Sequence, residues 1–144
     1  MLDITPEEMV AIRLSAKVAT VAVLASLPAG ILVAYVLARW RFPGKIILDG
    51  IVHLPLVLPP VVTGYVLLLL FGRRGPLGSV LEQTLGLVLS FRWTGAALAA
   101  AVMSFPLMVR AIRLSMEAID QRTEQAAATL GASPFWVFFT VTLP

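Results

Sequence analysis

The sequence of 144 residues is strongly apolar, with a mean hydropathy of +0.94, 59% hydrophobic residues and only 13% charged residues. Soluble domains carry about a quarter of their residues as charged side chains, so this composition excludes an ordinary soluble domain and predicts an integral membrane protein. The formal charge of +3 does not indicate nucleic-acid binding, because the basic residues mostly flank apolar runs, where they set membrane topology. Cysteine is absent, which excludes a disulfide framework and a thiolate metal site.

The first predicted membrane span covers residues from about 14 to 38. Thr5 and Pro6 are suited to begin the helix, because threonine caps free N–H groups and proline fits the first turn. Residues 18–38 then carry no charge, which is enough helix to cross about 30 Å of hydrocarbon. A cleaved signal peptide would need a positive leader and an apolar core of about 7–15 residues, and neither condition is met. Pro28 predicts a kink within the span.

The second predicted span, residues 47–71, is rich in proline. The short basic loop before it, residues 39–45, is predicted to be cytoplasmic by the positive-inside rule. Three prolines remove three backbone donors and do not fit one regular helix. Irregular backbone at membrane depth is tolerated where it faces protein or a water-filled cavity, so we expect part of a transmembrane pathway or a hinge beside it. Kinking that serves only helix packing is the open alternative. The residues assigned to the pathway or hinge are Pro55, Pro59, Pro60, Thr63 and Gly64, together with Ser104 further along the chain.

Two polar residues, Asp49 and His53, lie near the start of this span. Asp49 is expected to pair with Lys45. His53 is expected to be an interfacial or packed histidine rather than a metal ligand, because the sequence has no cysteine and no second histidine. The Gly–Lys step ending at Lys45 is not a phosphate-binding loop, because position 39 is Arg rather than Gly and Ile46 follows the lysine. The chain therefore shows no nucleotide site of its own.

Residues 71–92 are predicted to form a loop on the opposite side of the membrane. Arg73 and Arg74 lie in it, either as a solvated turn or as a pair that attracts an oxyanion or contacts a docked binding protein. Residues 85–91 are apolar but too few to span, so an interfacial or re-entrant piece is expected there.

The third predicted span, residues 93–112, is rich in alanine, which allows close helix approach. Ser104 lies within it and offers a hydroxyl, either to a passing oxyanion or for packing. Arg110, Arg113 and Arg122 follow and predict a return to the cytoplasm. With the N-terminus outside, the three spans then alternate in direction.

An amphipathic helix is predicted over residues 115–130 on the cytoplasmic side. Its apolar or small residues recur at steps of three and four, at Met116, Ile119, Thr123, Ala126, Ala127 and Leu130. Gly131 follows, where a residue without Cβ takes the left-handed conformation that ends a helix. Ser133 and Pro134 suit the start of a new helix, so a further span is expected from about residue 134. A helix-turn-helix DNA reader has a similar outline but needs base-reading donors in its second helix, and residues 135–141 offer almost none.

The same stretch carries a family pattern: a glycine, nine residues, a β-branched residue, one residue, then Leu-Pro. The residues that match it are Gly131, Val141, Leu143 and Pro144, with Gln125, Ala126 and Ala127 ahead of them. This pattern resembles the EAA loop of the permease subunits of binding-protein-dependent ABC importers. Gln125 stands where the family has glutamate, and Glu124 lies one residue earlier. FPGK at 42–45, HLPLVLPPVVTGY at 53–65 and MSFPLMVRAIRL at 103–114 resemble the molybdate permease subunits in particular, and the resemblance covers nearly the whole chain.

The resemblance implies an all-α integral membrane protein with the type I transmembrane domain of ABC importers. Residues 1–144 would form a single domain with three complete spans, a cytoplasmic coupling helix and the start of a fourth span, and the sequence would be an N-terminal fragment. The chain itself would hold no catalytic site, metal or cofactor, because ATP and Mg would bind a separate ATP-binding subunit. The residues expected to contact that subunit are Glu124, Gln125, Ala126, Ala127, Leu130 and Gly131.

The resemblance also implies further partners: a second permease copy in a homodimer, an extracytoplasmic molybdate-binding protein and the lipid of the cytoplasmic membrane, but no nucleic acid. Tungstate, sulfate and thiosulfate remain alternative substrates, because the residues do not distinguish tetrahedral dianions of similar size. An uncoupled channel or carrier is the alternative from a different class. A membrane-embedded enzyme is disfavoured, because the uncharged span cores hold no catalytic cluster.

Overall fold

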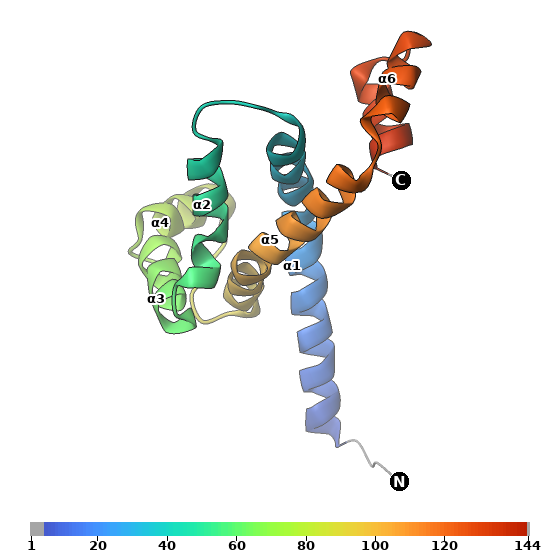
Figure 1. Ribbon diagram of the computed structural model, residues 1–144. Coiled ribbons are helices and arrows are strands. Elements are labelled where there is room, and N and C mark those ends of the chain that lie inside the picture. Colours follow the sequence, from blue (N-terminus) through green and yellow to red (C-terminus); the bar gives the residue numbers. More distant parts are fainter. Residues whose placement is uncertain (1–4, 144) are drawn as a thin grey trace.

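The computed structural model describes residues 5–143 and is built from helices joined by short connections. Figure 1 shows the chain running from a long N-terminal helix to a group of short helices at the opposite end of the molecule. In chain order the elements are α1 (Pro6–Arg39), α2 (Lys45–Val57), α3 (Pro60–Phe71), α4 (Pro76–Leu85), α5 (Trp93–Ala118), α6 (Gln121–Thr129) and α7 (Pro134–Val137), followed by the π-helix η1 (Phe138–Thr142).

Helix α1 begins after Thr5, as predicted. The Thr5 hydroxyl accepts a hydrogen bond from the Glu8 backbone N–H at 3.3 Å, and the Glu8 carboxylate accepts one from the Thr5 N–H at 2.7 Å. This reciprocal capping satisfies donors that a helix start otherwise leaves without partners. The helix continues for 34 residues to Arg39 and contains Pro28 without ending there. It is therefore longer than the predicted first span by about two turns at its N-terminal end.

Helix α5 lies against α1 and runs in the same direction. Three contacts, in order along both helices, define this parallel pairing: Lys17–Trp93, Gly30–Met108 and Arg39–Met116. The starts of the two helices therefore lie toward one side of the molecule, and their ends lie toward the other. The third predicted span is also longer than expected, because α5 continues beyond residue 112 to Ala118.

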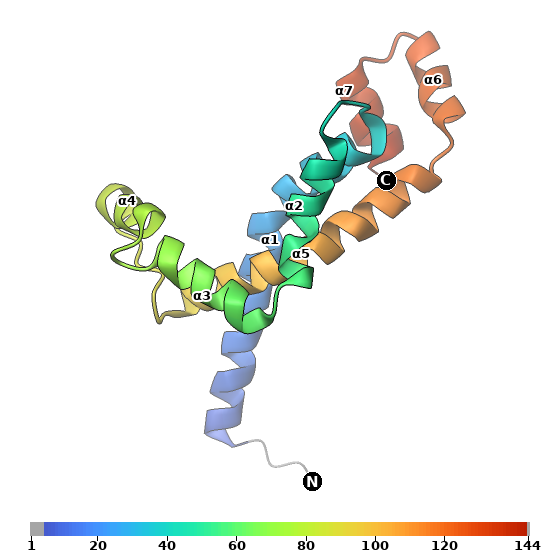
Figure 2. The same ribbon diagram turned by 60° about the vertical axis from the view of Figure 1, so that its left-hand side comes forward.

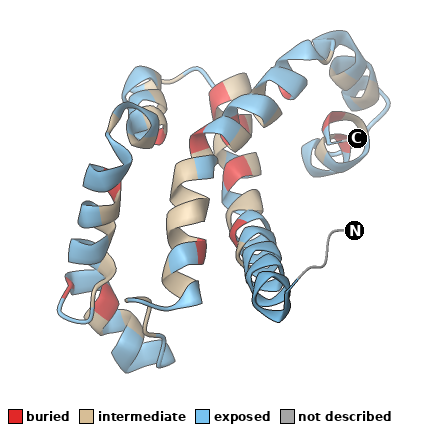
Figure 3. Ribbon diagram, turned by 90° about the horizontal axis from the view of Figure 1, so that it is seen from below, coloured by how far each residue is buried: buried red, intermediate tan, exposed pale blue. Residues whose placement is uncertain are grey.

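The core lies where α1, α2 and α5 meet. Its buried residues are Ala34 and Leu37 of α1, Val52 of α2 and Val109 of α5. Figure 3 shows buried positions scattered along the helices, whereas much of the helix surface is exposed or intermediate. Apolar side chains are exposed on the helices, and Val61 of α3, for example, has 82% of its surface accessible. Such side chains suit a surface that lipid or another protein chain covers.

The second predicted span is interrupted, as its prolines indicated. Helices α2 and α3 together are long and apolar enough to cross a membrane, but they meet at a bend of 111°. The break falls at Leu58 and Pro59, whose backbone is extended. Pro55, in contrast, lies inside α2 without ending it. Helices α1 and α5 pass the same length and composition test individually.

Helix α4 was not predicted from the sequence, and the expectation of a loop over residues 71–92 is wrong for this part. Pro76 occupies its first turn, and Gly86 ends it with a left-handed φ of +63°. Figures 1 and 2 both show α4 beside α3. The apolar residues 86–91, expected in an interfacial or re-entrant piece, form the non-helical connection from α4 to α5.

Candidate functional site

Helix α6 lies beyond the end of α5, at the opposite end of the molecule from the N-terminus (Figure 2). The prediction of one continuous helix over residues 115–130 is wrong. Helix α5 ends at Ala118, the backbone is extended at Ile119 and Asp120, and α6 follows. The Asp120 carboxylate accepts a hydrogen bond from the Arg122 backbone N–H at 2.9 Å and so caps α6. Because aspartate favours such a cap over a helix interior, it offers the physical reason for a break at this position.

Gly131 ends α6 with a left-handed φ of +85°, as predicted. Its N–H donates to the Ala128 carbonyl at 3.0 Å, and the Ala132 N–H donates to the Ala127 carbonyl at 3.2 Å. These two hydrogen bonds satisfy carbonyls that the end of a helix leaves free. A Cβ built at Gly131 would have no atom within 4 Å, so the backbone conformation, rather than lack of space, favours glycine here.

Most of the residues predicted to contact an ATP-binding subunit lie on the surface of α6 or at its end. Leu130 has 88% of its surface accessible. Gln125, Ala126 and Gly131 are also exposed, and Ala127 is half-buried. A large apolar side chain held this far out of the fold is suited to contact another protein.

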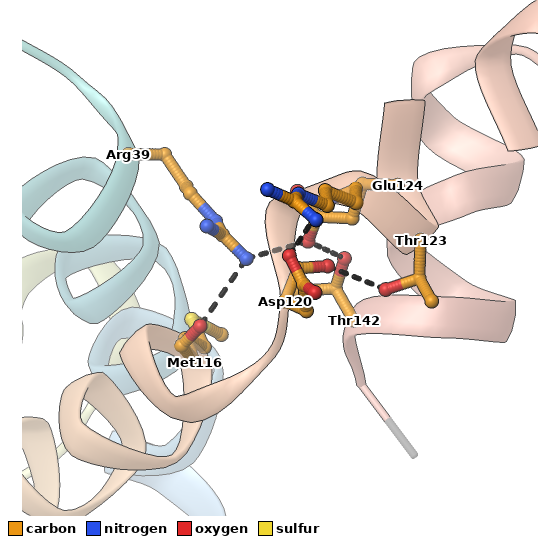
Figure 4. Close-up of polar contacts among 7 residues, drawn as sticks. Arg39, Met116, Asp120, Thr123, Glu124 and Thr142 are labelled. Carbon is orange, nitrogen blue, oxygen red and sulfur yellow. Dashed lines mark hydrogen bonds and ion pairs between the residues drawn. The ribbon is translucent and has the colours of Figure 1, made fainter. Parts of the chain in front are cut away.

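Glu124 differs from these residues, because its carboxylate is engaged within the chain. Figure 4 shows that one oxygen, Oε1, accepts hydrogen bonds from Arg39 Nη2 at 2.6 Å and from Thr142 Oγ1 at 2.7 Å. The same Arg39 nitrogen donates to the Met116 carbonyl at 3.2 Å. The Arg39 side chain is 11% exposed and the Glu124 side chain 20% exposed. In the sequence, Arg39 marks only the start of the basic loop, and no pattern connects it with Glu124.

The helix that follows Gly131 begins as predicted. The Ser133 hydroxyl accepts a hydrogen bond from the Trp136 backbone N–H at 3.3 Å, and Pro134 occupies the first turn of α7. The chain then continues into the π-helix η1. Tyr35 of α1 packs edge-on against Phe138 of η1, with 5.1 Å between the ring centroids and 84° between the planes. The start of this helix is therefore packed on α1.

The bend between α2 and α3 holds most of the residues predicted for a pathway or hinge. The Pro59 carbonyl accepts hydrogen bonds from the Val62 N–H at 2.9 Å and the Thr63 N–H at 3.1 Å, and Pro60 occupies the first turn of α3. Thr63 is only 5% exposed. The turn that follows the bend thus satisfies its own backbone groups, as irregular backbone at membrane depth requires.

The remaining residues predicted for the pathway do not gather around one cavity. Pro55 lines an apolar cavity of about 420 Å³ between α1, α2 and α5. Gly64 lines a different cavity of about 390 Å³ between α3, α5 and the connection before α5. Ser104 lines neither cavity, and its hydroxyl donates to the Ala101 carbonyl of its own helix at 3.3 Å.

A polar cluster joins α2 to α5 near the C-terminal half of α5. Asp49 pairs with Arg113 at 3.4 Å rather than with Lys45, so the predicted partner is wrong. Arg113 also pairs with Glu117 at 2.8 Å. His53 Nδ1 lies 2.8 Å from the Asp49 carbonyl oxygen, which accounts for this histidine as a packed side chain. The Asp49 and Arg113 side chains are 41% and 28% exposed, so solvent weakens their attraction.

The long apolar helices and the apolar outer surface define a helical, multi-pass membrane component, with a short exposed helix beyond the end of α5. The chain belongs to the family described as the inner membrane component of binding-protein-dependent transport systems, whose model matches residues 26–144. The resemblance to the permease subunits of these importers is thereby confirmed, as is placement in the inner membrane.

The curated relatives include permease proteins of molybdenum and sulfate transport systems. The chain is 59% identical over 141 residues to the molybdenum transport system permease protein ModB of Escherichia coli K12, covering 98% of this chain and 62% of that protein. It is 58% identical over 137 residues to ModB of Haemophilus influenzae, covering 95% and 60%. Its identity to the sulfate transport system permease protein CysW of Synechococcus elongatus is 39% over 134 residues, covering 93% and 46%. The chain thus spans less than two thirds of the length of each of these relatives.

Proposed function

We propose that the chain belongs to the membrane-spanning subunit of an ATP-driven importer that carries molybdate across the cytoplasmic membrane. The observation that carries this proposal is the exposed helix α6, which ends at the left-handed Gly131 and presents Leu130 to the outside of the fold. The 59% identity to a molybdenum transport permease, against 39% to a sulfate permease, favours molybdate as the substrate. Tungstate, sulfate and thiosulfate are the alternatives within this class.

A separate ATP-binding subunit would hold ATP and Mg and would bind α6. A short helix laid in a groove is a recurring mode of recognition between proteins. Leu130 would be the apolar anchor, the small side chains of Ala126 and Ala127 would allow close approach, and Gln125 would offer a polar contact at the rim. Gly131 would fix the direction in which the chain continues into α7.

The parallel pairing of α1 and α5 supports three crossings of the membrane. Lys17 lies near the start of α5 and Arg39 near its end, and the 22 residues between them span about 33 Å of helix. This distance is close to the thickness of the hydrocarbon core. Residues 40–92 must return across it, so the bent pair α2–α3 fits a broken span better than a re-entrant loop. The basic loop at 39–45 would be cytoplasmic and the N-terminus outside.

A second permease copy would complete the pathway, and an extracytoplasmic binding protein would deliver the anion. The bend at Pro59 and Pro60, with Thr63 and Gly64 after it, is the part we propose to line the pathway or to act as its hinge. Discontinuous helices occupy such positions in other transporters. Ser104, Pro55 and their surroundings in α5 and α2 would then support the bend from the side of the core.

The test uses the full-length permease in detergent. Co-purified subunits would be identified, and ATP hydrolysis would be measured after reconstitution with binding protein and either molybdate, tungstate, sulfate or thiosulfate. Leu130→Asp is the informative variant, and Leu77→Asp in α4 is its matched control, because Leu77 is also an exposed leucine, with 46% of its surface accessible.

We expect an ATP-binding subunit to co-purify with the parent protein and with Leu77→Asp but not with Leu130→Asp. Hydrolysis should rise most with molybdate-loaded binding protein. If sulfate stimulated hydrolysis more than molybdate, the substrate assignment would be wrong. If no ATP-binding subunit bound the parent protein, an uncoupled channel or carrier would replace the importer.

A further inference from the structure

We propose that Arg39, Glu124 and Thr142 form a three-helix tie that makes α6 move together with the end of α1 and the start of the next helix. The three residues come from α1, α6 and η1, and Figure 4 shows them converging on one carboxylate oxygen. This inference rests on the proposed function, because the movement in question is the one that an ATP-binding subunit would impose on α6. In this role Glu124 is a positioning residue rather than a contact with the partner.

The geometry of the tie concentrates its hydrogen bonds on two atoms. Glu124 Oε1 accepts from both Arg39 Nη2 and Thr142 Oγ1, at 2.6 and 2.7 Å. Arg39 Nη2 donates in addition to the carbonyl of Met116, which lies in the last turn of α5 where helix carbonyls lack partners within the helix. The tie therefore also reaches α5.

The tie is largely shielded from solvent, and this shielding strengthens its hydrogen bonds. Thr142 is 5% exposed, and the Arg39 and Glu124 side chains are 11% and 20% exposed. Hydrogen bonds between ionised groups are stronger than neutral ones, and they weaken when water reaches them. Within residues 5–143, buried Arg39 Nε has no hydrogen-bond partner, and the guanidinium reaches both Glu124 and Met116 through Nη2.

The tie bridges both connections of α6, the one from α5 and the one to α7. The chain leaves α5 through the extended residues Ile119 and Asp120, and it leaves α6 through the left-handed Gly131. Without cross-links these two points would let α6 pivot. The bond to Arg39 bridges the first point and the bond to Thr142 bridges the second. A push on α6 is therefore passed to α1 and η1 instead of being absorbed in the connections.

The packing of Tyr35 on Phe138 lies beside the tie and joins the same two helices, α1 and η1. It holds these helices together through their aromatic rings. The carboxylate of Glu124 ties α6 to this pair by accepting hydrogen bonds from Arg39 and Thr142. Neutralising this carboxylate should loosen α6 while leaving the contact between α1 and η1 in place.

The experiment compares Glu124→Gln with Glu117→Gln in the full-length permease assembled with its ATP-binding subunit. Glu117 is the matched control, because it also pairs with an arginine, at 2.8 Å, but within α5. Three quantities are measured: recovery of the ATP-binding subunit, molybdate transported per ATP hydrolysed, and amide hydrogen exchange over residues 121–129. A charge-exchanged double variant, Arg39→Glu with Glu124→Arg, tests whether the pairing itself matters.

We expect Glu124→Gln to keep the ATP-binding subunit and its hydrolysis, but to lower transport per ATP by about fivefold or more. Exchange over α6 should become about tenfold faster, because the glutamine oxygen can still accept both hydrogen bonds but no longer carries the charge that strengthens them. Glu117→Gln should leave both quantities within about twofold of the parent protein, because its pair is exposed. The charge-exchanged variant should recover part of the transport ratio.

Loss of the ATP-binding subunit from Glu124→Gln alone would overturn the tie, because Glu124 would then be a partner contact. Equal transport ratios and equal exchange in the two single variants would overturn it as well. If the parent permease bound no ATP-binding subunit, the proposed function would fail, whereas the exchange measurement would still decide whether Glu124 holds α6.

Discussion

Met108 of α5 packs against the backbone of α1 at Gly30, where a Cβ added to the glycine would lie only 2.8 Å from the Met108 Cε methyl group. Replacing glycine by alanine inside a helix stabilises it by about 1 kcal/mol when space permits. At Gly30 we expect this gain to be smaller, because the terminal methyl group of Met108 must shift to make room. Gly50 in α2 is the control, since a Cβ there has no atom within 4 Å. The unfolding temperature in detergent should therefore rise more for Gly50→Ala than for Gly30→Ala.

Shortening the neighbouring side chain provides a second comparison at the same place. Met108→Ala combined with Gly30→Ala should restore part of the gain that Gly30→Ala lacks, because the added methyl group then has space. Equal unfolding temperatures for Gly30→Ala and Gly50→Ala would contradict the close contact between α1 and α5.

Gly131 supports a prediction that separates backbone conformation from steric fit. Gly131→Ala should lower stability by about 1–2 kcal/mol, the cost of holding an ordinary residue in the left-handed conformation. Because no atom lies within 4 Å of the added Cβ, no further steric cost is expected. Gly131→Asn should cost less, since asparagine tolerates this conformation. Unfolding temperature and transport per ATP should fall together, in the order Gly, Asn, Ala, and normal transport by Gly131→Ala would exclude the assigned role of this turn.

The contact between Lys17 and Trp93 should stabilise the paired starts of α1 and α5. Lys17 Nζ lies 3.9 Å from the centroid of the indole ring, and a cation over an exposed aromatic face contributes about 0.5–1 kcal/mol. Lys17→Met and Trp93→Leu should each lose this amount, Lys17→Arg should keep it, and the double variant should lose no more than either single variant. Additive losses in such a cycle would show that the two side chains do not interact.

The absence of cysteine makes the proposed topology directly testable, because single cysteines can be introduced without background. Pro43→Cys and Gln83→Cys replace exposed, uncharged positions in the loop before α2 and in α4. In intact cells a membrane-impermeant maleimide should label Gln83→Cys, and Pro43→Cys should react only after permeabilisation. Labelling of both positions from outside would mean that α2 and α3 enter and leave on the same face.

The features predicted well from the sequence are those set by neighbouring residues. The cap at Thr5, the left-handed Gly131, the new helix start at Ser133 and the interruption at Pro59 all follow from local backbone chemistry. Membrane character and the family resemblance likewise follow from short stretches of the chain. These local signals predict the class of protein and most of the residues exposed on α6.

The features that were missed have two different causes. The sequence contains local signals for α4, in Pro76 and Gly86, and for the end of α5, in the capping Asp120, but the apolar pattern alone favours a loop and one continuous helix there. The pairing of Arg39 with Glu124, in contrast, joins residues 85 positions apart. No local pattern predicts such a contact, because it depends on how α1 packs against α5. The same holds for Asp49 and Arg113, where a closer lysine had been expected.

The π-helical turn η1 sets the direction in which Thr142 lies around the helix axis. A π-turn contains one residue more than an α-turn, and one residue corresponds to about 100° of rotation about an α-helix axis. If residues 138–142 rewound into an α-helix, Thr142 would swing by up to about 100° and its hydroxyl would leave the Glu124 carboxylate. The bond to Glu124 thus favours the π-helical winding of residues 138–142, because an α-helical winding of the same five residues would break it.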